Sequence, residues 1–87
     1  SQDNKEKDVV RIDSNTYILD GSAQIREVNK ILSRKIPESN AKTINGYILE
    51  CLGDIPERGV LFQTSDYSFE IMKVKNNFVK NVKITKR

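Results

Sequence analysis

Apolar residues at the start of the chain occur in two short runs separated by polar residues, a pattern that predicts a β-hairpin. Residues 9–12 form the first run and residues 16–19 the second. The Asp-Ser-Asn sequence at residues 13–15 is typical of a turn. The second predicted strand is followed by Asp20 and Gly21, which close the hairpin.

A first stretch with helical spacing follows this hairpin. Ser22 is placed to cap a helix that starts at Ala23. The helix is predicted to end before Pro37, because the residue that precedes a proline is disfavoured in the α conformation. Its apolar residues are three or four positions apart and predict one buried stripe, made of Ile25, Val28, Ile31 and Leu32.

A second helix has the clearest periodicity in the sequence. Thr43 is its predicted N-terminal cap, Gly53 suits a left-handed C-terminal cap, and Pro56 lies just beyond. The apolar positions recur at i, i+3, i+4, i+7 and i+8 and comprise Ile44, Tyr47, Ile48, Cys51 and Leu52. We therefore expect this helix at the centre of the core. Gly46, in its first turn, is interpreted as a packing glycine that lets a strand approach closely.

The second half of the chain has the apolar spacing of β-strands. Three strands are predicted, at residues 60–63, 68–75 and 78–85, and Asn76 and Asn77 form the turn between the last two. The predicted order of elements is β-β-α-α-β-β-β. This order indicates an α+β fold with two helices packed on a small antiparallel sheet.

Two lysines interrupt the alternation in the last two predicted strands. Lys73 stands where a buried residue is expected and Val74 is apolar instead, so we expect a β-bulge near residues 72–73 that returns Val74 to the buried side. The buried face of the last strand is predicted to comprise Phe78, Val82 and Ile84. Lys80 is the exception on that face.

The 87 residues of the chain are enough for one domain. Residues 1–8 are polar and are interpreted as a linker, with the domain at residues 9–87. No signal peptide is expected in this polar start, and the longest apolar runs, of three residues, are far shorter than the ~20 of a membrane-spanning helix. The single cysteine cannot form an internal disulfide, which favours a reducing, intracellular setting.

Basic residues are concentrated at the end of the chain, although the net charge is only +3. The segment 73–87 contains no acid and carries Lys73, Lys75, Lys80, Lys83, Lys86 and Arg87. We take its five lysines as a candidate interaction surface for an acidic partner or an anionic membrane. The alternative is a solvated edge strand that its lysines keep soluble. Nucleic acid is not expected, because Phe69 and Phe78, two aromatic residues near the basic strands, are needed in the core.

Residues able to carry out catalysis or to hold a transition metal are scarce. The sequence has no histidine and one cysteine, which excludes zinc and iron–sulfur sites and the usual general base. Cys51 is interpreted as a buried structural thiol. The carboxylates lack EF-hand spacing, and the four glycines are too dispersed for a phosphate-binding loop. We therefore expect that the chain is not an enzyme and that it has no metal site and no cofactor.

An ordered set of short motifs between residues 16 and 86 resembles the transporter-associated domain of CorC/HlyC-type proteins. The set comprises YILDGS at 17–22, TINGY at 43–47, LGDIPERG at 52–59, FEI at 69–71 and a closing basic strand. Its most specific part is T-x-x-G followed by L-G-x-I-P-x-x-G.

The resemblance implies a setting and a function. Members of the family look like the ends of membrane proteins that contain a transmembrane region and a pair of CBS modules, and they are associated with magnesium and cobalt efflux or haemolysin-like activity. The resemblance thus implies a non-catalytic regulatory or assembly domain on the cytosolic side of the cell membrane, with the rest of the parent protein as partner and a homodimer as a further option. The family fold is similar to part of the FAD-binding fold of p-cresol methylhydroxylase-type oxidases. The alternative is therefore a binding module for FAD or for an adenine nucleotide such as AMP.

Overall fold

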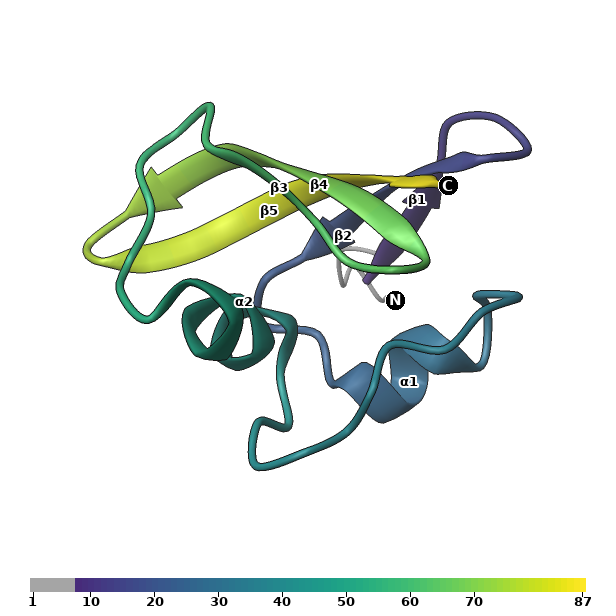
Figure 1. Cartoon of the computed structure of the whole chain (residues 1–87), viewed down its shortest axis with the longest axis horizontal. Coiled ribbons are helices and arrows are strands. Elements are labelled where there is room, and N and C mark those ends of the chain that lie inside the picture. The colour runs from purple at the N-terminus through teal and green to yellow at the C-terminus, as the bar shows by residue number, and fades with distance from the viewer. Residues whose placement is uncertain (1–7) are drawn as a thin grey trace, which may run out of the picture.

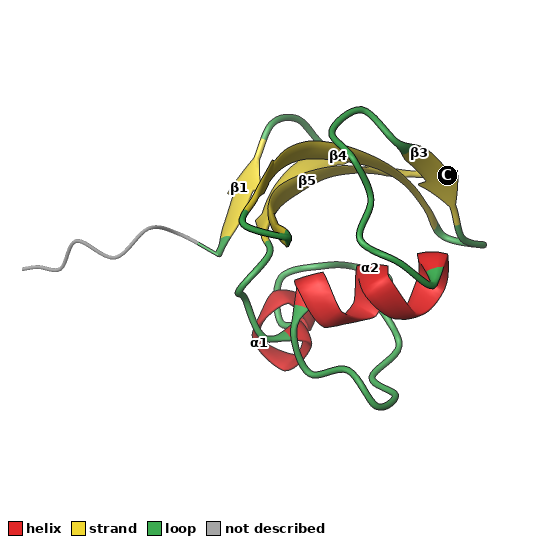
Figure 2. Cartoon of the chain, turned by 90° about the vertical axis from the view of Figure 1, so that its left-hand side faces the viewer, coloured by secondary structure: helices red, strands yellow, loops and turns green. Residues whose placement is uncertain are grey.

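Five antiparallel strands form one curved sheet, and two helices cover one of its faces (Figures 1 and 2). The computed structural model describes residues 8–87, so the predicted linker lies, except for Asp8, outside the described residues. The elements are β1 (Val9–Arg11), β2 (Thr16–Asp20), α1 (Ile25–Asn29), α2 (Ile44–Leu52), β3 (Leu61–Gln63), β4 (Tyr67–Lys75) and β5 (Phe78–Lys86). In space the strands are ordered β1-β2-β5-β4-β3. The predicted α+β class and order of elements are confirmed, and none of the elements of residues 8–87 covers the face of the sheet away from the helices, which we call the open face (Figure 2).

The first helix begins later than predicted, and Ser22 does not cap it. Residues 23–25 are held against residues 42–44 by two backbone hydrogen bonds, of 2.8 and 3.0 Å, which delay the helix. The Ser22 hydroxyl donates instead to the Asp20 carboxylate at 2.6 Å. Because α1 is only five residues long, Ile31 falls outside it and is 56% exposed, contrary to the prediction. The buried residues of the predicted stripe are Ile25, Val28 and Leu32.

The second helix has its predicted ends and most of its predicted buried face. The Thr43 hydroxyl accepts the Gly46 N–H at 3.1 Å, and Gly53 ends the helix in the left-handed conformation with φ 80°. The buried residues are Ile44, Tyr47 and Ile48. Leu52 is half-buried, whereas the prediction of a buried Cys51 is wrong. The core lies under the first part of α2, and Cys51 is exposed because it belongs to the last turn.

The bulge predicted near residues 72–73 is present, and a second irregularity on the facing strand matches it. The pairs along this part of the hairpin are Ile71 with Val82, Lys73 with Asn81, and Val74 with Val79. Met72 on β4 and Lys80 on β5 are therefore both extra residues. The extra residue shifts the alternation of β5, so Val79 is buried while Phe78 is only half-buried, contrary to the prediction. Lys80 is exposed, and the rest of the predicted face is buried.

Gly21 is the point of closest backbone approach among the glycines. A Cβ atom there would lie 1.7 Å from the carbonyl oxygen of Val79. The Gly21 N–H donates to the carbonyl of Lys80 at 2.8 Å, and the Gly21 carbonyl accepts the N–H of Asn45, also at 2.8 Å. The side-chain carbonyl of Asn45 accepts the Val79 N–H at 2.9 Å. This cycle of contacts joins the end of β2, β5 and the first turn of α2.

Gly46 is tightly packed, but not against a strand. A Cβ atom at this position would lie 3.2 Å from the Cβ of Ala41 and 3.3 Å from the hydroxyl of Thr43. The prediction of a strand beside Gly46 is therefore wrong, because the contact that this glycine allows is with the loop that precedes α2. An added methyl group at Gly46 would require a shift of only a few tenths of an ångström, whereas at Gly21 it would overlap the backbone of β5.

Replacement of Gly21 tests the backbone contact. We expect Gly21→Ala to lower the free energy of unfolding by about 2–4 kcal/mol, because the added methyl group forces β2 and β5 apart. Gly46→Ala is the matched control and should change this free energy by less than about 1 kcal/mol. Urea unfolding followed by circular dichroism measures both values. Equal losses for the two variants would show that the contact at Gly21 is not special.

A second pair of variants tests how far the core extends under α2. We expect Ile48→Ala to cost about 2–5 kcal/mol, since Ile48 is fully buried. Cys51→Ala, one turn further along, should cost less than about 0.5 kcal/mol, since its thiol is exposed. Chemical denaturation of the two proteins compares them directly. A large loss for the Cys51 variant would mean that the last turn is packed after all.

Two buried tyrosines should make the fold sensitive to alkali. Burial raises the pKa of Tyr47 above its ordinary value, the neighbouring Cys51 raises it further, and burial also raises the pKa of Tyr67. Between the unfolded and folded pKa values the unfolded chain has lost protons that the folded chain keeps, so stability falls as pH rises. We expect the free energy of unfolding to decline above about pH 10. Tyr47→Phe should reduce this slope, and an unchanged slope would exclude Tyr47 as its source.

Candidate interaction surface

The structure divides the five candidate lysines among three places on the sheet. Lys83 lies in the middle, where its ammonium group is 3.5 Å from the Glu70 carboxylate. Lys86 lies near the far end of β5 and donates to the Ser33 hydroxyl at 3.4 Å. The remaining three gather near the turn of the β4–β5 hairpin, and we call them the hairpin-end lysines: Lys73, Lys75 and Lys80.

The hairpin-end lysines lie on the open face of the sheet. Val74 pairs with Val79 on the side that the helices cover, and both contact the core. Because side chains alternate along a strand, Lys73 and Lys75 on either side of Val74 point to the opposite, open face. Lys75 pairs there with Phe78, and the Lys80 ammonium lies 5.7 Å from the centre of the Phe78 ring. The three lysines therefore share one exposed patch.

The hairpin-end lysines form no ion pair within the part of the chain that the structure describes. Glu70 on the same side of the sheet pairs with Lys83. Asp20 only accepts the neutral Ser22 hydroxyl, at 2.6 Å, and keeps its negative charge, and Asp8 lies opposite it, just before β1. The hairpin end is thus a cationic patch, and Asp20 lies in the same cross-strand row, on the other side of Asn81 from Lys73.

The middle of the open face carries a row of side chains that crosses all five strands. The residues paired in this row are, in order, Val10, Ile18, Lys83, Glu70 and Leu61. Its central ion pair is flanked by aliphatic side chains, of which Leu61 is 71% and Val10 46% exposed. A neighbouring row is uncharged and comprises Thr16, Thr85, Ser68 and Gln63. The positive charge of the open face that is not in an ion pair therefore gathers at the hairpin end, while Asp8 and Asp20 lie at the β1–β2 edge of the same face.

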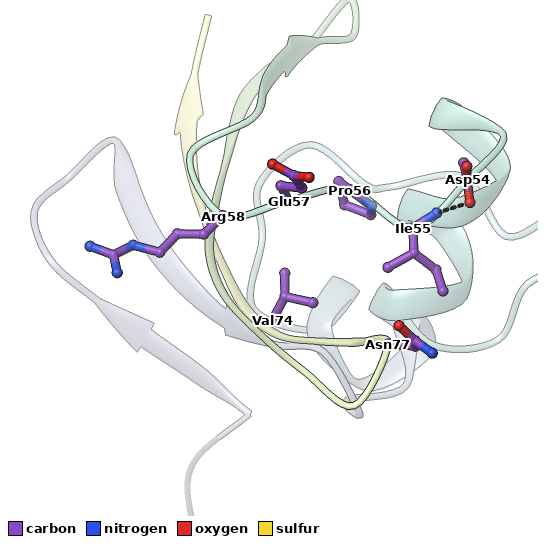
Figure 3. Close-up of a pocket in the computed structure, with 7 residues that line it drawn as sticks. All are labelled: Asp54, Ile55, Pro56, Glu57, Arg58, Val74 and Asn77. Carbon is purple, nitrogen blue, oxygen red and sulfur yellow. Dashed lines mark hydrogen bonds between the residues drawn. The ribbon is translucent and has the colours of Figure 1, made fainter.

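A groove of about 520 Å³ lies on the other side of the same hairpin, under the segment that follows α2 (Figure 3). The lining residues are Asp54, Ile55, Pro56, Glu57, Arg58, Val74 and Asn77. Val74 points from β4 toward this segment, and Arg58 points away from the groove (Figure 3). The segment is fixed at both ends, since Asp54 accepts the Ile55 N–H at 2.7 Å and Gly59, with φ 90°, donates to the Ile71 carbonyl at 2.7 Å.

The polar groups of the groove are not arranged as a metal or phosphate site. In residues 8–87 no three acidic or sulfur side chains come together as metal ligands. The carboxylates of Asp54 and Glu57 line the groove and oppose an anionic ligand. The L-G-x-I-P-x-x-G motif, which is visible in the sequence, forms one wall of the groove, but the groove itself was not predicted. The groove depends on the opposite wall at Val74, which belongs to a later strand.

Known proteins match nearly the whole chain. The family profile of the CorC/HlyC transporter associated domain matches residues 10–87. The UPF0053 inner membrane protein YfjD of Escherichia coli K12 is 41% identical over 69 residues, which are 79% of this chain and 16% of that protein. The polyamine export protein of Salmonella typhimurium is 30% identical over 83 residues, 93% of this chain and 19% of that protein. Hemolysin C of Brachyspira hyodysenteriae is 28% identical over 85 residues, 97% of this chain and 32% of that protein.

Solved structures have the same fold. A conserved protein from Haemophilus influenzae Rd KW20, described as functionally unknown, has a TM-score of 0.83 and 31% identity over 93% of this chain and 100% of that one. A CorC/HlyC transporter associated domain from Nitrosomonas europaea has a TM-score of 0.83 and 22% identity over 95% and 100% of the two chains. The described residues include no helix with the length and apolar character needed to span a bilayer. Since the family profile covers residues 10–87, this chain belongs to the CorC/HlyC transporter associated domain family.

Proposed function

We propose that this chain is a non-catalytic regulatory or assembly domain of a larger CorC/HlyC-type membrane protein that exports a cation. The chain spans between 16% and 32% of the length of the three relatives described above, so in those proteins the domain accompanies a much longer sequence. One relative is named an inner membrane protein and another a polyamine export protein. By analogy, the exported cation is magnesium or cobalt, as the family resemblance implies, or a polyamine.

The open face of the sheet is the observation that carries this proposal. The helices cover one face, while the other exposes Leu61, Val10 and the hairpin-end lysines, as an interdomain surface would. No charged side chain in residues 8–87 is buried, so there is no support for a catalytic group tuned by burial. The domain is therefore better suited to contact than to chemistry.

The proposed location is the cytosolic side of the cell membrane, beside a pair of CBS modules and the transmembrane region of the parent protein. The domain would regulate export by contacting these parts differently in two states of the transporter, because only a difference in contact energy shifts such an equilibrium. If the parent is a homodimer, the two copies of the domain would also be able to contact each other.

A binding module for FAD or an adenine nucleotide is the second candidate. The volume of the groove, about 520 Å³, is in the range of small-molecule sites and favours this alternative. The lining opposes it, because Asp54 and Glu57 repel phosphate and Pro56 has no N–H to donate. We expect no binding of FAD or AMP in calorimetry at micromolar concentrations. A micromolar Kd for either would make the nucleotide module the better proposal.

Deletion of the domain from the parent protein tests the regulatory proposal. We expect the truncated parent to reach the membrane in normal amounts but to export its cation at a rate changed by about fivefold or more, the usual size of allosteric coupling. Efflux of magnesium, cobalt and putrescine from cells measures the effect. Cys51→Ala, which alters an exposed side chain outside the open face, is the control and should export normally. Normal export and normal assembly of the truncated parent would together contradict the proposal.

A further inference from the structure

We propose that the hairpin end of the open sheet face docks on an anionic lipid surface. The docking surface consists of the hairpin-end lysines and the ring of Phe78. This inference rests on the proposed function in one respect, because a membrane-anchored parent protein would hold the surface near a bilayer. It goes beyond the proposed function because it names a partner of the domain and the residues that contact this partner.

The hairpin geometry concentrates the three charges. Asn76 and Asn77, with φ 55° and 62°, form a two-residue turn that leads β4 directly into β5. Lys75 therefore lies across from Phe78, beside Lys73 on the same face. Lys80 joins them because it is the extra residue of β5, and its ammonium lies 5.7 Å from the Phe78 ring centre. Regular alternation would have placed Lys80 in the core or left the patch with two lysines.

The electrostatics of the open face point toward an anionic partner at this end only. Glu70 and Lys83 neutralise each other in the middle of the face, while Asp20, although hydrogen-bonded to Ser22, stays charged and lies across Asn81 from Lys73. No ion pair of residues 8–87 has to break before the hairpin-end lysines meet external anions. Within these residues the three lysines outnumber the two acids on this part of the face that form no ion pair, Asp8 and Asp20, so a net attraction for anions remains.

The chemistry of the patch suits a bilayer better than a discrete acidic ligand. Lysines are compact point charges and lack the bidentate geometry with which arginine recognises a single carboxylate or phosphate. The groove that could enclose a ligand opens on the other side of the hairpin. Phe78 is half-buried and Met72 is 37% exposed, so apolar surface lies next to the charges, as at a lipid headgroup boundary.

The helix layer supplies a matched basic surface for comparison. Lys30 lies 3.2 Å from Glu27, and Arg34 lies 3.7 Å from Asp66, so part of its positive charge is compensated. Three of its exposed lysines are equal in number and charge to the hairpin-end set: Lys30, Lys35 and Lys42. Because they belong to the other layer, they separate an effect of location from an effect of net charge.

Docking by three lysines is weak and depends on salt. Each basic residue near an anionic bilayer strengthens binding roughly fivefold, so three together account for on the order of a hundredfold. The Debye length of about 10 Å at 0.1 M salt means that higher salt suppresses this attraction. A tether in the parent protein raises the effective concentration of the bilayer to about millimolar, at which weak docking matters.

Nuclear magnetic resonance of the nitrogen-labelled 87-residue chain with lipid nanodiscs tests the proposal, since it detects weak binding residue by residue. With nanodiscs that contain phosphatidylglycerol, we expect signal loss centred on residues 72–81, and none with pure phosphatidylcholine. Replacement of Lys73, Lys75 and Lys80 by Gln should weaken binding on the order of a hundredfold. The same replacement of Lys30, Lys35 and Lys42 should weaken it by less than about fivefold. The amide spectra of both variants also report whether they are folded.

Three outcomes would overturn the docking proposal: equal signal loss with the two lipids, equal weakening in the two triple variants, or signal loss centred on the helix layer. This titration involves no transport, so its failure is separable from failure of the proposed function. If the chain does not bind the nanodiscs while deletion of the domain still changes export, the lipid is the wrong partner. An acidic protein surface then becomes the better candidate for the partner of the hairpin-end lysines. If the chain docks but the deletion has no effect on export, the regulatory function fails and the docking stands.

Discussion

The backbone contact at Gly21 is the constraint on which the arrangement of the two layers depends. At this point the end of β2 lies against the backbone of β5, and Asn45 of α2 is hydrogen-bonded to both Gly21 and Val79. The two helices, of five and nine residues, are too short to be stable alone, so they need this connection to the sheet. It fixes α2 over Val79 on one side of the sheet. The opposite side is left without a covering element in residues 8–87 (Figure 2).

The β4–β5 hairpin serves both sides of the sheet at once. Val74 contributes to the core and to the groove, while Lys73 and Lys75 on either side of it face solvent. A change of one residue in this hairpin therefore acts on packing or on charge according to the face it occupies. The groove and the cationic patch are back to back, and a ligand in one would not contact the other. This separation lets the two surfaces be altered independently.

Features that depend on contacts between residues close together in the sequence could be predicted, and features that depend on contacts between distant residues could not. The ends of α2 were predictable because Thr43 and Gly53 act within one turn. The start of α1 was not, since it is set by pairing with residues 42–44, far along the chain. The basic residues were visible in the sequence, but their division into one patch and two bonded lysines was not. That division depends on Glu70 and Ser33, which come from other elements.

The two extra residues of the hairpin, Met72 and Lys80, have a consequence for how the length of this hairpin can vary in evolution. Each adds one position to its strand, so regular pairing on both sides of the irregularity requires that both be present or both be absent. Loss of Met72 alone, with regular pairing of the strands, would slip them by a residue and exchange the buried and exposed faces of β5 beyond it. Val79 would then turn to solvent and Phe78 to the core. Insertions and deletions at this place should therefore occur in pairs, one in each strand, so that the two strands change length together.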